Sequence, residues 1–387
     1  MKAMILAGGK GTRVQPLTNR VPKPMIPIIS KPIMEFLVEV LRQHGFNQII
    51  VSTSYLADAI ENYFREGSRF GVEMGYSFEG YHADGRTVAE GLGSAGGLKK
   101  IQDFSGFFDD TFAVLCGDAL IDLDLKAALL EHRRKGAMAS VITREVPWDK
   151  VSNYGVVVTD KTGRITQFQE KPKQEEALSN FISTGIYIFE PEVIDLIPSG
   201  VEFDIGSQLF PLLAEKGMPF YAQGRPFNWL DIGSVSDYWE VLQNVLTGEV
   251  NHMDVPGIQI EPGLWTGLNT SIDWRGTTIK GPVYIGSGVK IEAGATIVGP
   301  TWIGHGSHIC EGAEIVRSVL FEYTRVLNDV TLHEMIVFKD YSIDRAGEMK
   351  HVSECSSQEW LNARDRRHSR RTEQAEETDK TLEKANA

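Results

Sequence analysis

The chain has 387 residues, which is enough for two domains, and its 42% hydrophobic and 24% charged residues are typical of a globular protein. Its formal net charge of -13 argues against a general nucleic-acid binder, because such proteins present a basic face to the phosphate backbone. The three cysteines lie far apart without metal-ligand spacing, and no apolar run is long enough to cross a bilayer. We therefore expect free thiols in a cytoplasmic protein with no membrane or nucleic-acid partner.

The first part of the chain, to about Leu246, alternates short apolar runs with amphipathic segments. Four runs have the composition of buried strands, at residues 3–6, 49–52, 112–116 and 140–143. Two segments have apolar residues at helical spacing and end in a glycine, at residues 31–45 and 124–136. The alternation predicts an α/β domain with a Rossmann-like mixed sheet, mainly parallel, that binds ligands at the carboxyl ends of its strands.

After about Asn251 the sequence follows a six-residue repeat. Isoleucine occupies the same position of successive repeats, at residues 279, 285, 291, 297, 303, 309 and 315. Phe321 and Leu327 continue this frame. Such a repeat predicts a left-handed parallel β-helix with apolar residues stacked along its coils, from about Ile258 to Leu332.

These patterns set the expected domain limits. The first domain is predicted at 1–250, the β-helix at 251–340 and a charged tail at 341–387. A β-helix of a few coils has open ends, so we expect this domain to hold subunits of a homo-oligomer together. Its large apolar residues Trp265, Trp302 and Phe321 are candidates for sharing across that interface. The alternative is that they cover the first domain of the same chain.

A glycine-rich loop, LAGGKGTRVQPLT, continues the first predicted strand at residues 6–18. Glycines let backbone N–H groups approach a phosphate without obstruction by a Cβ atom. The loop is not a Walker A motif, because Met4 stands where the earlier glycine is required and Lys10 is followed by glycine. Nor is it a dinucleotide-binding fingerprint, since Val14 stands at the third glycine position.

Together with the VPKPM segment that follows, the loop resembles the motif of the sugar-1-phosphate nucleotidylyltransferases, also called NDP-sugar pyrophosphorylases. This family joins a nucleoside triphosphate and a sugar-1-phosphate to give an NDP-sugar and pyrophosphate. The resemblance implies that Arg13 stabilises the leaving pyrophosphate and that Lys23 contacts the triphosphate. It also implies a nucleotide-binding loop formed by Leu6, Ala7, Gly8, Gly9, Gly11 and Thr12.

Further segments resemble the same family, and the hexapeptide repeats match its guanylyltransferase-like branch. VLCGDALID and FNWLDIGSVSDY imply Asp118 and Asp231 as ligands of Mg²⁺, with Asp118 also at the nucleotide. FQEKP implies that Glu170 binds sugar hydroxyls and that Lys171 binds the attacking sugar phosphate. The segment AEGLGSAGGL implies a base-binding loop of Gly93, Ser94, Ala95 and Gly96. Three more residues are implied at the sugar, namely Gly155 in NYGVV and Thr184 and Gly185 in FISTGIYIF.

The aspartates also have a structural interpretation. A turn follows Asp118 and Asp231, so each is also a candidate cap. Asp124, in the DLDL segment, mimics part of a metal motif, but we expect it to cap the next helix.

The substrate pair is indicated by one departure from the branch. Ser183 and Thr184 precede Gly-Ile-Tyr where that branch commonly has Asn-Ala, and the pattern resembles glucose-1-phosphate enzymes. We therefore expect UTP and glucose-1-phosphate to give UDP-glucose. The alternatives are GTP with mannose-1-phosphate, and dTTP or ATP with glucose-1-phosphate.

Two other classes of function compete with this one. A hexapeptide acyltransferase would use a histidine base in the repeats, where His305 and His308 lie. A regulatory paralogue would keep the fold and lose the cations and metal ligands, whereas this chain retains Arg13, Lys23 and Lys171.

Overall fold

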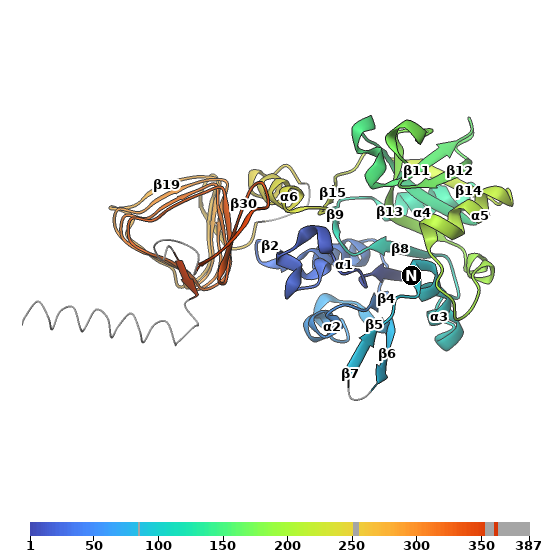
Figure 1. The fold of residues 1–387 in the computed structure, drawn as a ribbon, viewed down its shortest axis with the longest axis horizontal. Coiled ribbons are helices and arrows are strands. Elements are labelled where there is room, and N and C mark those ends of the chain that lie inside the picture. The colour runs from blue at the N-terminus through green and yellow to red at the C-terminus, as the bar shows by residue number, and fades with distance from the viewer. Residues whose placement is uncertain (84–85, 251–254, 353–359, 363–387) are drawn as a thin grey trace, which may run out of the picture. The chain divides into compact units, whose positions relative to one another are not determined.

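The computed structural model describes residues 1–83, 86–250, 255–352 and 360–362 (Figure 1). The chain divides into two compact units. Unit 1 comprises Met1–Ile26 and Lys31–Asp231, and unit 2 comprises Pro27–Ser30 and the chain from Ile232 onward. Helix α6 (Val235–Thr247) is grouped with unit 2 by its contacts, although it lies before residue 250, the predicted end of the first domain. The domain limits of the sequence analysis stay predictions.

Unit 1 is built on a nine-stranded mixed sheet. Its main path runs β12 (Ile165–Glu170), β11 (Gly155–Thr159), β13 (Phe181–Phe189), β8 (Phe112–Cys116), β1 (Lys2–Leu6), β4 (Gln48–Thr53) and β5 (Glu73–Phe78). Two more strands branch from β13, first β10 (Ala139–Glu145) and then β14 (Phe220–Gly224). Strands β8, β1, β4 and β5 are parallel neighbours, whereas β13 is antiparallel to β8. The predicted mixed sheet is confirmed, but it is not mainly parallel, because four of its strand pairings are parallel and four are antiparallel.

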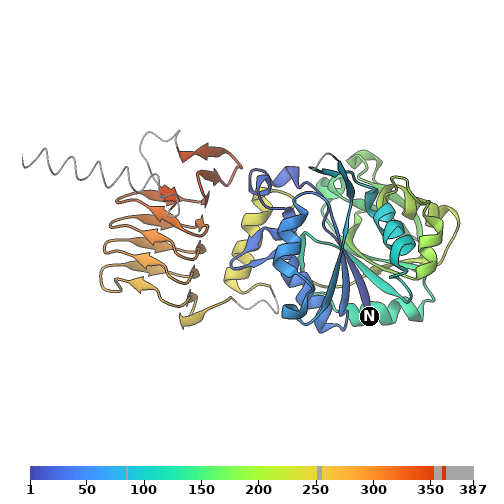
Figure 2. The same cartoon turned by 90° about the horizontal axis from the view of Figure 1, so that it is seen from below.

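Helices cover both faces of this sheet, as Figure 2 shows. They are α1 (Ile33–Gln43), α2 (Ala57–Phe64), α3 (Gly93–Ser105), α4 (Leu125–Arg134) and α5 (Phe210–Glu215). Successive residues of β1 point to opposite faces, so Ile5 lies in the core with α1, α2 and α4, while Met4 lies in the core with α3 and α5. Short strands complete the unit, β3 (Lys31–Pro32), β6 (Gly80–Ala83), β7 (Arg86–Ala89), β9 (Ala119–Ile121) and β15 (Trp229–Asp231).

The predicted elements of unit 1 correspond closely to the observed ones. The four predicted strands are β1, β4, β8 and β10, and the two predicted helices are α1 and α4. Asp124 caps α4 as expected, because its Oδ1 accepts a hydrogen bond of 2.9 Å from the backbone N–H of Ala127.

Unit 2 contains a parallel β-helix of three sheets whose strands stack coil on coil (Figures 1 and 2). The first sheet runs β16 (Ile258–Glu261), β17 (Leu264–Thr266), β20 (Val283–Ile285), β23 (Thr301–Ile303), β26 (Val319–Leu320), β29 (Met335–Phe338), β30 (Tyr341–Asp344) and β31 (Met349–His351). The second runs β18 (Ser271–Ile272), β21 (Lys290–Ile291), β24 (His308–Ile309), β27 (Thr324–Val326) and β32 (Trp360–Asn362). The third runs β19 (Thr278–Lys280), β22 (Thr296–Val298), β25 (Glu314–Val316) and β28 (Thr331–His333). Strand β2 (Pro27–Ile28) also belongs to this unit.

The isoleucine ladder forms the interior of the β-helix. Ile285 pairs with Ile303, Ile291 with Ile309 and Ile297 with Ile315, and all six are buried in one apolar core. The repeat therefore predicts the position of each interior residue, because one coil is three repeats long.

The predicted frame is wrong after Ile315. Leu320 and Val326, rather than Phe321 and Leu327, stack beneath Ile303 and Ile309. The cause is a shorter corner: the turn through Gly299 and Pro300 is replaced on the next coil by Arg317 alone, whose backbone φ is 44°. One residue is lost there, so every later interior position moves by one.

Two of the three aromatic residues predicted for an interface are buried within the chain. Trp302 is 2% exposed and Phe321 is 7% exposed. Their rings are tilted by 49° with centroids 5.2 Å apart, and Phe338 meets Phe321 edge to face at 4.8 Å. Trp302 and Phe321 are therefore not available for sharing with a second subunit, while Trp265 is partly exposed. No described helix is long and apolar enough to cross a membrane.

Candidate functional site

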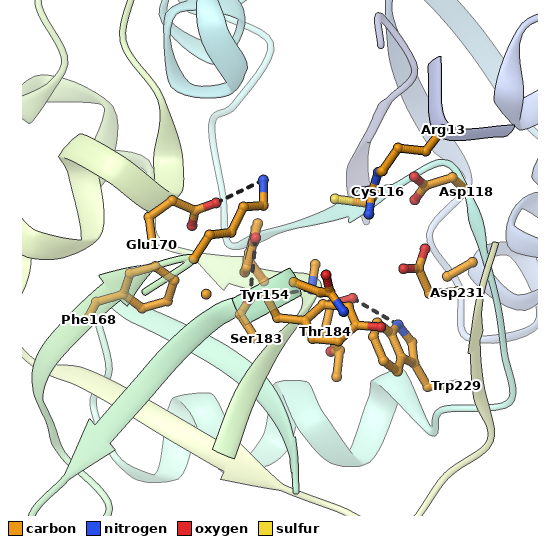
Figure 3. Close-up of a pocket in the computed structure, with 16 residues that line it drawn as sticks. Arg13, Cys116, Asp118, Tyr154, Phe168, Glu170, Ser183, Thr184, Trp229 and Asp231 are labelled. Carbon is orange, nitrogen blue, oxygen red and sulfur yellow. Dashed lines mark hydrogen bonds and ion pairs between the residues drawn. The ribbon is translucent and has the colours of Figure 1, made fainter. Parts of the chain in front are cut away.

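A cavity of about 180 Å³ opens beside the carboxyl end of β8 in unit 1 (Figure 3). Its lining includes eight of the residues predicted for the site, Arg13, Asp118, Gly155, Glu170, Lys171, Thr184, Gly185 and Asp231. They come from distant parts of the chain and are brought together because β8, β9, β11, β12, β13 and β15 end or pass there. The cavity thus lies where an open α/β sheet is expected to bind ligands.

Two carboxylates and an ammonium group converge at one edge of the cavity. The Lys23 Nζ lies 2.6 Å from Asp118 Oδ2 and 3.8 Å from Asp231 Oδ1. Antiparallel pairing of β9 with β15 places Ala119 opposite Asp231, which brings the two aspartates to the same point. Neither aspartate serves as the N-cap of a following helix, since Asp118 leads into β9 and the cap of α6 is Ser234.

This pair has the donor chemistry of a site for a hard divalent cation. Carboxylate oxygens are the ligands that Mg²⁺ takes from proteins, and the lysine ammonium between them shows that the position attracts positive charge. Lys23 itself is 8% exposed, and its stem packs against the glycine loop.

Two glycines of the loop lie so close to neighbouring side chains that a Cβ atom would crowd them. Gly11 has a backbone φ of 61°, and a Cβ atom there would lie 3.0 Å from the Lys23 side chain and from Thr18. A Cβ at Gly8 would lie 3.3 Å from Ser54, whereas a Cβ at Gly9 would meet nothing within 4 Å. Packing within the chain therefore does not require a glycine at position 9, and open space lies beside it.

The start of the loop is bonded to the sheet through Leu6 and Ala7. Gly117 N–H donates to Leu6 O, and Ala7 N–H donates to Ser52 O. Thr12 begins the short helix η1 (Thr12–Val14), which carries Arg13.

The predicted base-binding loop forms the N-terminus of α3, and its hydrogen bonds are partly used inside the chain. The N–H groups of Ala95 and Gly96 donate to Phe203 O at 3.0 and 2.8 Å. Ser94 Oγ donates to Asp204 Oδ2 at 2.6 Å. Burial alone would raise the pKa of Asp204, but hydrogen bonds from Ser94 and the following backbone lower it. Gly93 has a φ of 73°, and a Cβ there would come within 2.5 Å of Phe203 O, so the loop is held tightly against this segment.

A buried carboxylate beside this loop was missed by the sequence analysis. Glu79 is 7% exposed, follows β5 directly, and accepts a long hydrogen bond of 3.4 Å from the N–H of Leu92. Its carboxylate also lies against Gly8 and Gly97. Burial raises the pKa of Glu79, although the Leu92 N–H, Ser52 and Lys100 oppose that effect. The sequence carried little signal for this residue, because the EMGYSF segment before it is not an apolar run and Glu79 comes near the glycine loop only through strand order.

The sugar-side residues predicted from the sequence line the cavity together. Gly155 packs against Phe168, where a Cβ would lie 2.3 Å from the ring. Lys171 is exposed, adopts a φ of 45° and pairs with Glu170 at 3.2 Å. The Thr184 hydroxyl donates to Ile142 O at 2.9 Å, so the strand rather than a ligand satisfies it.

The structure adds residues of the quoted segments to which the sequence analysis gave no role. Trp229 Nε1 donates to Thr184 O at 3.1 Å, and its ring meets Tyr154 edge to face at 5.4 Å (Figure 3). Cys116 lies against Gly185, and burial, with Asp118 and Asp231 nearby, raises its pKa well above the ordinary value. The thiol is therefore neutral and is not an activated nucleophile.

The two histidines of the repeats lie in unit 2 and are both engaged. His305 Nδ1 accepts from the Ser287 N–H at 2.8 Å, and His308 Nε2 lies 2.9 Å from Glu292 Oε1. Both contacts are made between neighbouring coils of the β-helix.

Comparison with known proteins gives a consistent family. Residues 2–248 match the family model described as nucleotidyl transferase. A Synechocystis sp. protein named UTP–glucose-1-phosphate uridylyltransferase is 56% identical over 361 residues, 93% of each chain. A Xenopus tropicalis protein named mannose-1-phosphate guanylyltransferase catalytic subunit beta is 35% identical over 243 residues, 62% of each chain. A crystal structure of a putative glucose-1-phosphate thymidylyltransferase from Bacillus anthracis aligns with a TM-score of 0.55 and 23% identity, over 66% of this chain and 97% of that one, which shows a shared fold.

Proposed function

The chain belongs to the nucleotidyl transferase family, and we propose that it joins UTP and glucose-1-phosphate to give UDP-glucose and pyrophosphate. One observation carries the choice of substrates. The uridylyltransferase from Synechocystis is 56% identical over 93% of both chains, including the β-helix, whereas the guanylyltransferase match stops at 62%.

In this reaction an oxygen of the sugar phosphate attacks the α-phosphorus of UTP in line. A new P–O bond forms as the bond between the α-phosphorus and the bridging oxygen breaks, and pyrophosphate carries the negative charge away. The attacking phosphate is already anionic at neutral pH, so no general base is required. The work of the protein is to position the two anions and to neutralise the charge between them.

The cations of the site divide this task by position. Arg13 and Lys23, beside the glycine loop, would contact the triphosphate and the leaving pyrophosphate. Lys171, 59% exposed at the opposite wall with Glu170, would meet the sugar phosphate. Gly155, Thr184 and Gly185 would give the sugar a wall free of bulky side chains.

Enzymes of this family use a divalent metal, and we propose Mg²⁺ held by Asp118 and Asp231. When bound, the ion would neutralise phosphate charge in the transition state. Lys23 competes for the same two carboxylates, so it must move toward the phosphates as the ion binds.

A second candidate pair of substrates rests on Glu79, for which we propose a contact with the base. It lies against Gly8 of the glycine loop and contacts Leu92, which directly precedes the predicted base-binding loop. An ionised carboxylate accepts from the N3–H of uracil, but it accepts from both the N1–H and the exocyclic amine of guanine. This observation favours GTP, and with it mannose-1-phosphate, as the second candidate pair.

The proposal is tested by incubating the purified protein with UTP, glucose-1-phosphate and Mg²⁺ and identifying products by mass spectrometry. UDP-glucose and pyrophosphate in equal amounts are expected. Absence of both products with UTP, together with GDP-mannose from GTP and mannose-1-phosphate, would replace the proposal by its alternative.

A further inference from the structure

Three side chains of different donor type meet on two stacked coils of the β-helix. Strand β21 pairs with β24 so that Ile291 lies opposite Ile309, and the next residues, Glu292 and Cys310, follow in the same register. His308 begins β24 on the same side. One ligand atom from each of Glu292, His308 and Cys310 lies within 4.8 Å of the other two.

The backbone around this cluster is fixed by the ladder of the β-helix. Glu292 N–H donates to Ile309 O at 3.0 Å, and Cys310 N–H donates to Val326 O at 3.0 Å. Cys310 is 1% exposed, whereas about a quarter of the His308 side chain and 30% of the Glu292 side chain reach solvent. The thiol is thus buried, while the carboxylate and the imidazole beside it are partly exposed.

The charges favour an ionised carboxylate there. Glu292 Oε1 lies 2.6 Å from Lys290 Nζ and 2.9 Å from His308 Nε2, and its Oε2 accepts from Glu311 N–H at 3.2 Å. The Lys290 side chain is 53% exposed, so its ammonium can turn into solvent without a burial cost.

We propose that Glu292, His308 and Cys310 bind a zinc-type transition-metal ion. A thiolate, an imidazole nitrogen and a carboxylate oxygen are the three ligand types that Zn²⁺ takes from proteins, and the hard cation expected at Asp118 and Asp231 would not select a thiolate. The ion binds as Cys310 gives its thiol proton to solvent and His308 turns a neutral Nε2 toward it. Three protein ligands leave a fourth position for water.

Such an ion would link two coils of the β-helix. Its three ligands come from positions 292 and 308–310, so the metal cross-braces β21 and β24 through side chains as well as through the backbone ladder. The rigid strands keep the donors close before the ion arrives, which lowers the ordering cost of binding. The consequence is a β-helix whose stability depends on metal.

The test uses the full-length chain, stripped of metal with a chelator, without nucleotide or sugar, and titrated with Co²⁺. One equivalent is expected to produce a thiolate-to-cobalt charge-transfer band in the near ultraviolet together with the strong visible absorption of a four-coordinate ion. Zn²⁺ should remove both signals, and excess Mg²⁺ should not. Zn²⁺ should also raise the melting temperature of the stripped protein.

Variants identify the ligands. Cys310→Ser should abolish the near-ultraviolet band and the Zn²⁺-dependent rise in melting temperature. His308→Ala and Glu292→Gln should each weaken Co²⁺ binding by about tenfold or more. Glu311→Gln is the matched control, because Glu311 contacts the cluster through its backbone N–H only, and it should bind as the wild type does.

Two results would overturn the proposal. One is a stripped wild-type chain that gives no thiolate band with Co²⁺. The other is a band that persists in Cys310→Ser, which would assign the thiolate to Cys116 or Cys355. Neither result depends on UDP-glucose synthesis, so the outcome is separate from that of the proposed reaction.

Discussion

The two units place their important residues by different means. In the β-helix a fixed period puts Ile285, Ile291 and Ile297 above Ile303, Ile309 and Ile315, so each neighbour is found by counting. In unit 1 no period relates Arg13, Lys23, Asp118, Glu170 and Asp231, and only the topology of the mixed sheet brings them to one place. A repeat thus encodes architecture locally, whereas a site for two anions is assembled from distant segments.

The strongest test of this comparison is removal of one carboxylate in unit 1. Asp231→Asn should lower UDP-glucose synthesis by about 100-fold or more, the scale expected when charge stabilisation in the transition state is lost. The fold should persist, because Asp118 still pairs with Lys23 at 2.6 Å. Steady-state kinetics and circular dichroism measure the two effects.

Asp124→Asn is the matched control for that variant. Asp124 lies close in sequence to Asp118 but caps α4, and asparagine is an equally good N-cap. It should keep near-normal turnover. Near-normal turnover in Asp231→Asn instead would remove Asp231 from the metal site.

A smaller effect, on the preference between UTP and GTP, is expected from a change at Glu79 in unit 1. Glu79→Gln replaces a carboxylate, which accepts from both N1–H and the exocyclic amine of guanine, by an amide with a single acceptor oxygen for these two donors, while uracil N3–H keeps its acceptor. The ratio of kcat/KM for UTP to that for GTP should rise about tenfold, which matches the typical worth of one hydrogen bond to a charged group. An unchanged ratio would place the base away from Glu79.

In the β-helix the expected response is one of stability rather than of catalysis. Ile297 is completely buried and stacks against Ile279 and Ile315. Ile297→Val should reduce the free energy of unfolding by about 0.5–1.5 kcal/mol, as measured by urea denaturation, because one buried methylene group is lost. Turnover of the folded enzyme should not change, and a fall in kcat would show that the two units are coupled.

The smallest effect concerns a buried histidine in unit 1 and its two hydrogen-bond partners. His132 is completely buried, with Nδ1 2.8 Å from Ser140 Oγ and Nε2 3.1 Å from Glu190 Oε1. Burial lowers the pKa of His132 below its usual 6.5, although Glu190 opposes that shift. The unfolded chain therefore binds this proton more readily than the folded protein.

Stability should accordingly fall as the pH drops below about 6.5, by at most about 1.4 kcal/mol per pH unit from this one group. Denaturation curves of the wild type and His132→Asn between pH 7.5 and 5.5 measure the difference in slope. Parallel curves for the two proteins would show that His132 does not bind more protons on unfolding.

Much of the fold was predictable because it is encoded locally. Four strands of unit 1 (β1, β4, β8 and β10), the helices α1 and α4 and the cap at Asp124 follow from short patterns of apolar and polar residues. The shift of the ladder after Ile315 was not predictable, since the shorter corner at Arg317 has no strong turn signal. Phe321 also fits the original six-residue frame, although Leu320 is the residue that stacks on Ile303.

The site was only partly predictable, for a different reason. Motifs named residues on the loops, but Glu79 belongs to no quoted motif and enters through strand order alone. Cys116 and Trp229 lie within quoted segments that gave them no role. The use of the Ala95 and Gly96 N–H groups by Phe203 likewise depends on a contact between distant segments. The cluster of Glu292, His308 and Cys310 was missed because its spacing makes sense only once the coils are stacked.

The central claim is that unit 1 uses UTP with glucose-1-phosphate, and the most direct measurement is kcat/KM for four triphosphates, each with glucose-1-phosphate and mannose-1-phosphate. The account predicts the highest value for UTP with glucose-1-phosphate. A higher value for GTP with mannose-1-phosphate would contradict it.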